Sequence, residues 1–210
     1  MSRVAVVTGG SGGMGRAVVT HLRRERWNVT SLSRREGTDV GDEEQVVGAF
    51  SRFDRLDALI HCAGSLIRRP FAEIPSAEWD GQIRSSLRGA FLCSREAFRL
   101  MGATGGSIVL VSSLSGVAGA EKFAGMAAYV AAKSGLAGLT EALAVEGRPL
   151  GIRVNAVSPG AVDTEMLAAA GIAGPSLRPA EVARVITWLA SSRSEPLSGA
   201  NLRIDPPATG

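Results

Sequence analysis

A glycine-rich segment near the N-terminus constrains the fold more than any other feature of the chain. The letters TGGSGGMG, residues 8–15, follow the β-branched run RVAVVT at 3–8 and lead into GRAVVTHLRRE at 15–25, whose apolar residues have helical spacing. A strand, a tight glycine turn and a helix must therefore follow one another directly. A sheet built from such units is covered by its own helices, as parallel sheets are.

The same alternation continues along the chain. Apolar runs predict strands at 28–33, 57–61, 106–113, 151–158 and 201–204, and helical spacing is found at 42–53, 77–101, 127–147 and 179–190. This order predicts an α/β fold, a single doubly wound parallel sheet of the Rossmann type with helices on both faces. With 210 residues and 45% apolar content, we expect one domain over residues 1–210.

One interval is too short for a complete set of such units. Only five residues separate Ser33, at the end of the second strand, from Asp39. A parallel crossover that contains a helix needs at least about ten residues. The third strand unit is therefore predicted to be shortened or missing.

Charge, cysteine content and hydropathy exclude several classes of function. The net charge is +3, and the densest basic run lacks interleaved aromatic residues, so we expect no nucleic-acid partner. Two cysteines and two histidines are too few for a metal cluster or a disulfide framework. We see no signal-peptide pattern and no apolar stretch of membrane-spanning length. The sequence therefore predicts a cytoplasmic protein with no metal and no membrane association.

The position of the glycine turn predicts what it binds. Backbone N–H groups at the start of a helix are free, and the helix dipole favours negative charge there. Gly9 permits the tight turn, while Gly13 and Gly15 let a pyrophosphate and the helix approach the backbone; Ser11 and Met14 lie in the same turn. The strand–turn–helix context favours a dinucleotide site.

A serine hydrolase is the rival interpretation of the same turn. Gly9, Ser11 and Gly13 also match G-x-S-x-G, the nucleophile elbow. In the hydrolase order the histidine base follows both the serine and the acid, yet no histidine follows His61, and His21 lies on the helix immediately after the turn. We therefore disfavour the hydrolase.

The residues after the second strand indicate which dinucleotide is bound. Ser33 occupies the place where an acidic residue would bind the ribose 2′-hydroxyl, and Arg34 and Arg35 follow it. A guanidinium pairs with a phosphate, whereas a carboxylate would repel it. We predict NADP(H) over NAD(H), with Arg34 as the main contact; two arginines in a solvated turn are the alternative.

Several motifs in a fixed order identify a family resemblance. They are TGGSGGMG, DV at 39–40, HCAG at 61–64, VSS at 111–113, YVAAK at 129–133 and NAVSPGAVDT at 155–164. Over nearly its whole length the chain resembles the short-chain dehydrogenase/reductase family, in its short single-domain form similar to 3-oxoacyl-carrier-protein reductases. The resemblance implies further cofactor-binding residues, which are Asp39, Val40, Cys62, Ala63, Gly64, Pro159, Gly160, Val162 and Thr164.

The same resemblance implies a catalytic group. Ser113 would polarise a substrate carbonyl; Ser112 and Ser115 compete for this role, but the SxxG spacing to Gly116 favours Ser113. Tyr129 would donate a proton to the carbonyl oxygen. A phenol has an ordinary pKa of about 10 and needs a nearby positive charge to approach the working pH.

Lys133 lies one helical turn after Tyr129, on the same face of the 127–147 helix. It can supply that charge, and it would also hold the nicotinamide ribose and so bind the cofactor together with Tyr129. Ser86 is a departure from the family pattern, because SSLRG at 85–89 stands where VNLKG is usual. A backbone carbonyl at position 86 could still hold a water, and we expect slower proton resupply rather than lost activity.

Partners and substrate follow less directly. The family implies a homo-oligomer, a dimer or tetramer, formed through the 127–147 and 77–101 helices; small residues at Ala131, Gly135, Gly138 and Ala142 fit either that contact or packing within the chain. Apolar loops flank the site, which favours a small-molecule ketone or secondary alcohol on an apolar body. A non-catalytic dinucleotide-binding or regulatory protein of the same fold is the alternative to the enzyme.

Overall fold

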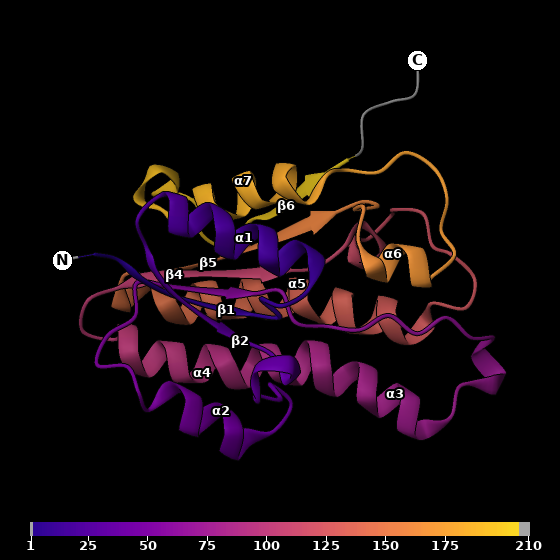
Figure 1. Cartoon of the computed structure of the whole chain (residues 1–210), viewed down its shortest axis with the longest axis horizontal. Helices are drawn as coiled ribbons and strands as arrows, with labels where there is room; N and C mark the ends of the chain where they lie inside the picture. Colours follow the sequence, from indigo (N-terminus) through magenta and orange to yellow (C-terminus); the bar gives the residue numbers. More distant parts are fainter. Residues whose placement is uncertain (1, 206–210) are drawn as a thin grey trace.

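The computed structural model describes residues 2–205, and within them the strands form one parallel sheet (Figure 1). The order across the sheet is β2-β1-β3-β4-β5-β6. The strands are β1 Val4–Thr8, β2 Asn28–Leu32, β3 Ala58–His61, β4 Gly106–Val111, β5 Ile152–Pro159 and β6 Asn201–Ile204. The prediction of a doubly wound α/β sheet is confirmed.

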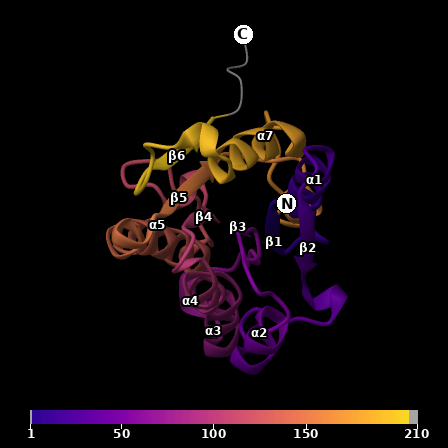
Figure 2. The ribbon, with the colours of Figure 1, turned by 90° about the vertical axis from the view of Figure 1, so that its left-hand side faces the viewer.

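Helices cover both faces of this sheet (Figure 2). On one face lie α1 Gly13–Arg24 and α7 Pro179–Ala190. On the other lie α2 Glu43–Phe50, α4 Gly89–Met101 and α5 Ala127–Gly147. Two further helices, α3 Ser76–Ile83 and the short α6 Glu165–Ala169, extend toward the end of the sheet where the strands finish. None of the helices between residues 2 and 205 is both long and apolar enough to span a bilayer.

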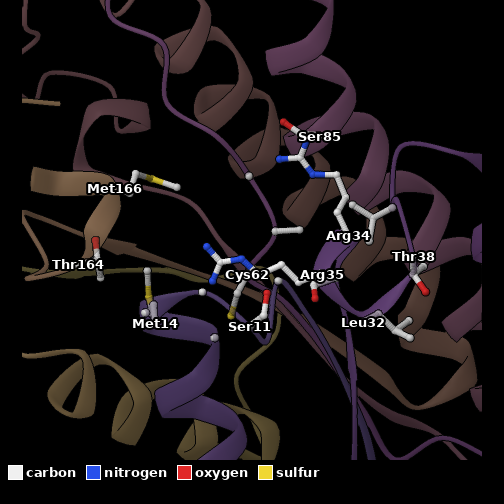
Figure 3. Close-up of a pocket in the computed structure, with 18 of the residues that line it drawn as sticks. Ser11, Met14, Leu32, Arg34, Arg35, Thr38, Cys62, Ser85, Thr164 and Met166 are labelled. Carbon is white, nitrogen blue, oxygen red and sulfur yellow. The ribbon is translucent and has the colours of Figure 1, made fainter. Parts of the chain in front are cut away.

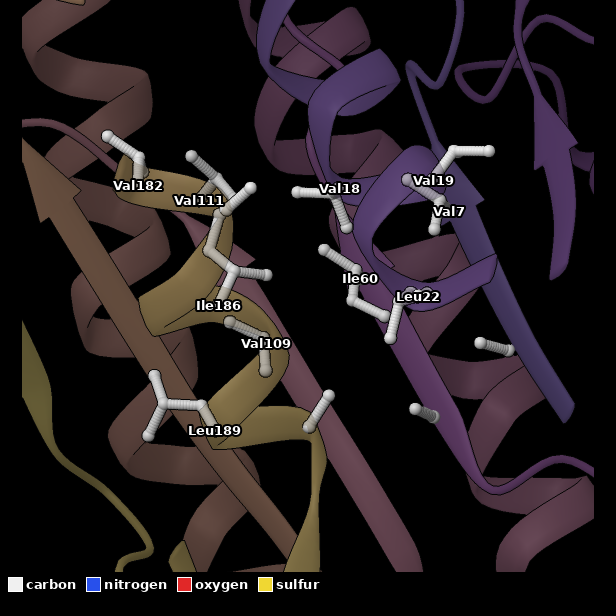
Figure 4. Close-up of a cluster of buried hydrophobic side chains, with 14 of the residues drawn as sticks. Val7, Val18, Val19, Leu22, Ile60, Val109, Val111, Val182, Ile186 and Leu189 are labelled. Carbon is white, nitrogen blue, oxygen red and sulfur yellow. The ribbon is translucent and has the colours of Figure 1, made fainter. Parts of the chain in front are cut away.

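A core of branched aliphatic side chains fixes α1 and α7 to the sheet (Figure 4). Val18 and Leu22 of α1 and Ile186 of α7 are fully buried against strand residues such as Ile60 and Val109. Each such side chain contributes about 1.5–3 kcal/mol relative to an exposed one. The packing therefore holds the start of α1 at the end of β1, which is where the glycine turn must lie.

The shortened third unit is also confirmed. Between β2 and α2 the chain forms only the 3-10 turn Arg34–Glu36, which Gly37 ends with a φ of 84°. Asp42 then caps α2 by accepting a hydrogen bond from the Gln45 N–H at 3.1 Å. β2 is consequently the edge strand of the sheet on this side. Of the single domain expected over 1–210, residues 1 and 206–210 lie outside the described range.

The helical segment predicted over 77–101 is confirmed, but it is not one regular α-helix. A π-helical turn, Arg84–Arg88, separates α3 from α4, and Ser86 lies in its middle. Such turns recur at functional sites, and apolar periodicity does not reveal them. The Gly89 N–H bonds to the carbonyls of Arg84 and Ser86, and a Cβ at Gly89 would lie 2.8 Å from Val40 Cγ2. Close packing at Gly89 thus accompanies the widened turn.

Candidate active site

The carboxyl ends of the strands carry two cavities. The first has a volume of about 330 Å³ (Figure 3) and is lined by most of the residues predicted to bind a cofactor, namely Gly9, Ser11, Gly13, Met14, Gly15, Ser33, Arg34, Arg35, Asp39, Val40, Cys62, Ala63, Gly64 and Thr164. Gly12, Leu32, Thr38, Ser85, Glu165 and Met166 complete the lining and were not predicted. Ligands of open parallel sheets bind at this edge.

The glycine turn forms a cradle that side chains would fill. Gly9 has a φ of 67°, and a Cβ there would lie 2.8 Å from the backbone of Ala63. A Cβ at Gly13 would lie 2.8 Å from Thr164 Cγ2. No side chain caps the first turn of α1, and that turn contains no acidic residue. Its N–H groups are therefore available to an anion, so the residues present fit the pyrophosphate of a dinucleotide.

Two guanidinium groups enter the same cavity (Figure 3). Arg34 extends toward Ser85, and Arg35 extends toward the side where Met14 and Thr164 lie. Arg35 Nη2 is 3.8 Å from Glu165 Oε2 at the start of α6. Both arginines are exposed, so their positive charge is available to a phosphate that enters the cavity.

The Ser33 hydroxyl is engaged by a neighbouring carboxylate. This hydroxyl donates to Glu36 Oε2 at 2.5 Å, and the Ser31 hydroxyl donates to the same oxygen at 2.7 Å. The 3-10 turn brings Glu36 back over β2, which a three-residue spacing allows. A carboxylate therefore lies beside the two arginines, and the sequence prediction did not account for it.

Asp39 and Val40 lie at the rim of this cavity, as expected from the motif. Asp39 Oδ1 accepts from the Gly41 N–H at 2.9 Å, and Asp39 Oδ2 is 3.4 Å from Arg84 Nη2. Val40 is buried against the same wall. These contacts hold the rim in place by linking the segment after β2 to the π-helical turn.

The second cavity is larger, about 620 Å³, and mostly apolar. Its lining includes Leu66, Phe123, Met126, Leu167 and Ile172, together with the predicted residues Ser113, Tyr129, Pro159, Gly160 and Val162. Met14, Thr164 and Met166 line both cavities. The two spaces therefore adjoin at these side chains, so a group bound in one can reach a group bound in the other.

Ser113 and Tyr129 both lie at the wall of the second cavity, and the Ser113 hydroxyl is near enough to the phenol to lower its pKa. Ser112 also lines this cavity, but its hydroxyl is engaged, because it donates to the Lys133 carbonyl at 2.7 Å. Ser115 contributes its N–H, which donates to Ser113 Oγ at 3.2 Å. Of the three competing serines, Ser113 is the one that the structure pairs with the phenol.

Gly116 explains the SxxG spacing in physical terms. A Cβ at this position would lie 2.6 Å from the Lys133 carbonyl carbon. The 3-10 turn Leu114–Gly116 can therefore pack directly on α5 only because residue 116 has no side chain. This close approach sets the distance between Ser113 and Tyr129.

Lys133 lies behind the cavities, with 5% of its surface exposed. Its Nζ donates to the Val111 carbonyl at 2.8 Å and lies 5.6 Å from the centre of the Tyr129 ring. Burial lowers the pKa of Lys133 to about 8, against the influence of Cys62. Burial also raises the pKa of Tyr129, and the Ser113 hydrogen bond opposes that rise. Lys133 was expected to lower the pKa of the Tyr129 phenol. The protein groups alone do not produce that lowering.

Ser86 is fully buried in the π-helical turn and lines neither cavity. Its carbonyl, which we expected to hold a water, lies 3.0 Å from His61 Nε2. Its hydroxyl accepts from Gln82 Nε2 at 3.3 Å. His61 and Gln82 are therefore partners of the site that the sequence prediction missed. For His61 the signal was present, since it begins HCAG where NNAG is usual.

Comparisons with known proteins agree with this geometry. The profile of the family described as Enoyl-(Acyl carrier protein) reductase matches residues 29–206. The chain is 36% identical to cis-4-hydroxycyclohexanecarboxylate dehydrogenase of Sinomonas cyclohexanicum, over 97% of this chain and 95% of the relative. It is 32% identical to acetoacetyl-CoA reductase of Allochromatium vinosum, over 98% of each chain.

A solved structure described as ElxO with NADP bound has a TM-score of 0.87 and 27% identity, covering 98% of each chain. Fold, cradle and relatives together define an oxidoreductase of the Rossmann class that binds a nicotinamide dinucleotide. More narrowly, the chain belongs to the short-chain dehydrogenase/reductase family.

Proposed function

We propose that the chain is an NADP(H)-dependent oxidoreductase that interconverts a ketone and a secondary alcohol on a mostly apolar molecule. One observation carries this proposal: Ser113 and Tyr129 lie together on the wall of an apolar cavity that adjoins the glycine cradle. A proton donor is thus placed next to a nucleotide-sized site. The curated relatives are named dehydrogenases and reductases.

Each catalytic residue has a distinct task in this proposal. In the direction of reduction, Ser113 donates a hydrogen bond to the substrate carbonyl oxygen and Tyr129 gives that oxygen its proton. The bound nicotinamide supplies the hydride. Burial raises the pKa of Tyr129 and so makes the phenol a weaker acid, which is why a nearby positive charge matters for its role as proton donor. Lys133 holds the ribose hydroxyls and adds positive charge beside the phenol.

Turnover with a panel of ketones tests the enzyme against its alternative, a binding protein of the same fold. We expect NADPH oxidation with at least one apolar ketone. Tyr129→Phe keeps the ring and removes the proton, so kcat should fall at least 100-fold. The NADPH dissociation constant should change little, because the glycine cradle is unaltered. Absence of turnover in the wild type on every ketone, with NADPH still bound, would favour the binding protein.

Cofactor preference is the second part of the proposal. Arg34 and Arg35 in the first cavity support NADP(H), whereas the Glu36 carboxylate at Ser33 opposes it. The lining also holds the carboxylates of Asp39 and Glu165, and Glu165 lies 3.8 Å from Arg35, so Arg34 is the guanidinium that most favours the 2′-phosphate. The preference is therefore expected to be moderate.

Isothermal titration with the two reduced cofactors measures this preference. We expect NADPH to bind about tenfold more tightly than NADH, a difference of about 1.4 kcal/mol. Arg34→Gln should remove most of the difference by weakening NADPH alone. Tighter binding of NADH by the wild type would contradict the proposal.

The proposals for the substrate, the assembly and the location rest on more general features of the structure. The lining of the second cavity supports an apolar body next to the reacting carbonyl, and Arg203 and Asp205 stand at its edge as a pair 3.8 Å apart. A homo-oligomer is supported by exposed Val145 on α5 and Phe91 on α4. A cytoplasmic location fits the unpaired thiols of Cys62 and Cys93.

A further inference from the structure

A group of buried polar side chains lies behind Gly64, on the protein side of the cofactor cavity. Gln82 and Ser86 are fully buried, and Lys133 nearly so. Ser86 Oγ and Lys133 Nζ lie 3.0 and 3.6 Å from the point where a Cβ on Gly64 would be. Both polar atoms therefore border the same bare stretch of backbone, on the side away from water.

The amide of Gln82 has a single orientation in this group. Its Nε2 donates to the Ser65 carbonyl at 2.6 Å and to Ser86 Oγ at 3.3 Å, and its Oε1 accepts from the Ser65 hydroxyl at 3.4 Å. An amide nitrogen can only donate, so Ser86 Oγ is an acceptor in this contact. A serine hydroxyl otherwise rotates freely, and Gln82 removes that freedom.

The main chain of Ser86 is held from the opposite direction. Its carbonyl can only accept, so the 3.0 Å contact requires a proton on His61 Nε2. The neutral ring then accepts at Nδ1 from the Thr8 hydroxyl, 2.9 Å away. Burial, reinforced by the charge of Lys133, lowers the pKa of His61 to about 3 and keeps the ring neutral. Because the Ser86 carbonyl already accepts a hydrogen bond, the hydroxyl is the atom of Ser86 that can accept one from Lys133.

Lys133 has hydrogen-bonding capacity left over. An ammonium carries three protons, and the Val111 carbonyl takes one of them. We propose that Gln82 is a positioning residue, which holds the Ser86 hydroxyl as a further acceptor for the Lys133 ammonium, directly or through one water. The titratable groups that face Lys133 are His61, Cys62 and Tyr129. The effect on turnover rests on the proposed function, whereas the effect on Lys133 does not.

The two lysines of the chain, Lys122 and Lys133, make a direct test possible. Labelling lysine with ¹³C at the ε carbon gives one NMR signal for each, and Lys122→Arg identifies which is which. In the cofactor-free wild type, Lys133 should titrate near pH 8. Ser86→Ala should lower that midpoint by about one pH unit, because the variant removes a hydrogen-bond acceptor that favours the charged ammonium.

Variants of Gln82 then separate positioning from general stability. Gln82→Met should lower the Lys133 midpoint, and the decrease should not exceed that of Ser86→Ala. The double variant, Gln82→Met with Ser86→Ala, should lower the midpoint no further than Ser86→Ala alone. Gln82→Leu likewise cannot donate to Ser86 and adds no charge, so it should lower the midpoint in the same way. This second variant keeps the test usable if Gln82→Met does not fold.

The matched control is Ser107→Ala. Ser107 is a buried serine at the other end of the sheet, and its hydroxyl donates to the Leu189 carbonyl at 2.9 Å. We expect a lower melting temperature and an unchanged Lys133 midpoint. The proposal would be overturned if the Lys133 midpoint is unchanged in Gln82→Met. It would also be overturned if the double variant lowers the midpoint by the sum of the two single decreases.

Turnover gives a separate reading of the same variants. In Gln82→Met the pH profile of kcat should move in the same direction as the Lys133 midpoint, and Ser86→Asn should restore it in the double variant, because an amide at position 86 brings its own polar atoms. If the wild type has no activity while Lys133 responds as described, the proposed function fails and the positioning role stands. If activity is present and Lys133 does not respond, the positioning role fails alone.

Discussion

Burial and hydrogen bonding act on the Tyr129 phenol in opposite directions. Its ring is 8% exposed, which raises the pKa, and the Ser113 hydrogen bond partly reverses that rise. Reduction needs the protonated phenol, whereas oxidation of an alcohol needs the phenolate. In the protein without a cofactor, burial therefore favours the protonated form of Tyr129, the form that reduction needs.

His61 gives a prediction for stability against pH. Its pKa is lowered from 6.5 to about 3 in the folded chain, so between these values the unfolded chain holds a proton that the native chain lacks. The stabilisation is complete above pH 6.5 and is lost as the pH falls toward 3, at up to about 1.4 kcal/mol per pH unit. Urea unfolding at pH 6.5 and 5.0 should show a loss of about 2 kcal/mol from this group.

His61→Asn is the comparison for that measurement, because asparagine does not titrate in this range. The variant should lose about 2 kcal/mol less than the wild type between pH 6.5 and 5.0. Equal losses in the two proteins would show that His61 is not the group responsible.

At the scale of elements, α5 organises the proposed catalytic group through backbone contacts. It carries Tyr129 and Lys133 on one face, and its backbone meets Gly116 and the Ser112 hydroxyl. The turn that bears Ser113 is thereby fastened to the helix that bears the phenol. Glycine at 116 thus has a steric role, because it permits this contact.

Gly116→Ala should separate the two elements. Its Cβ would overlap the Lys133 backbone, so the turn must move and the distance between Ser113 and Tyr129 should increase. We expect kcat to fall at least tenfold and the unfolding free energy to fall by about 1–3 kcal/mol. Gly48→Ala is the matched control, since no atom lies within 4 Å of its Cβ position in α2. That variant should gain about 0.5–1 kcal/mol and keep its kcat; equal kcat values in the two variants would argue against the steric role.

The sequence was a good guide to regular elements and a poor one to departures from regularity. The ranges of α5 and α7 were predicted to the residue, because apolar spacing and the glycine or proline at their ends determine them. The π-helical turn was missed, because one extra residue in a turn leaves the apolar pattern of 77–101 almost unchanged.

The site shows the same division. Motif positions placed the lining of the first cavity, because each motif follows a strand and all strands end at one edge. The partners of Ser33, Ser86 and Lys133 could not be predicted in this way. They depend on contacts between segments far apart in sequence, such as the 25 residues between His61 and Ser86.

For the whole molecule, the exposed face of α4 and α5 makes assembly testable. Val145 is 69% exposed, Phe91 is 46% exposed, and a Cβ at Gly138 would meet no atom within 4 Å. Light scattering after size exclusion should give the mass of a dimer or tetramer. Val145→Glu should reduce that mass, because it places a charge in the contact. Val47→Glu changes a valine that is 40% exposed on α2 and should leave the mass unaltered; a monomeric wild type would contradict the proposal.

The shortened third unit leaves β2 at the margin of the sheet, with its outer hydrogen-bonding groups unpaired by another strand. Open edges of this kind recruit strands from other chains and so promote aggregation, and charged side chains are a common protection. Arg23 from α1 covers part of this edge, since its Nη2 lies 3.4 Å from the Val29 carbonyl. The arginines near β2 thus have a second role, because their charge opposes pairing of this open edge with a strand of another molecule.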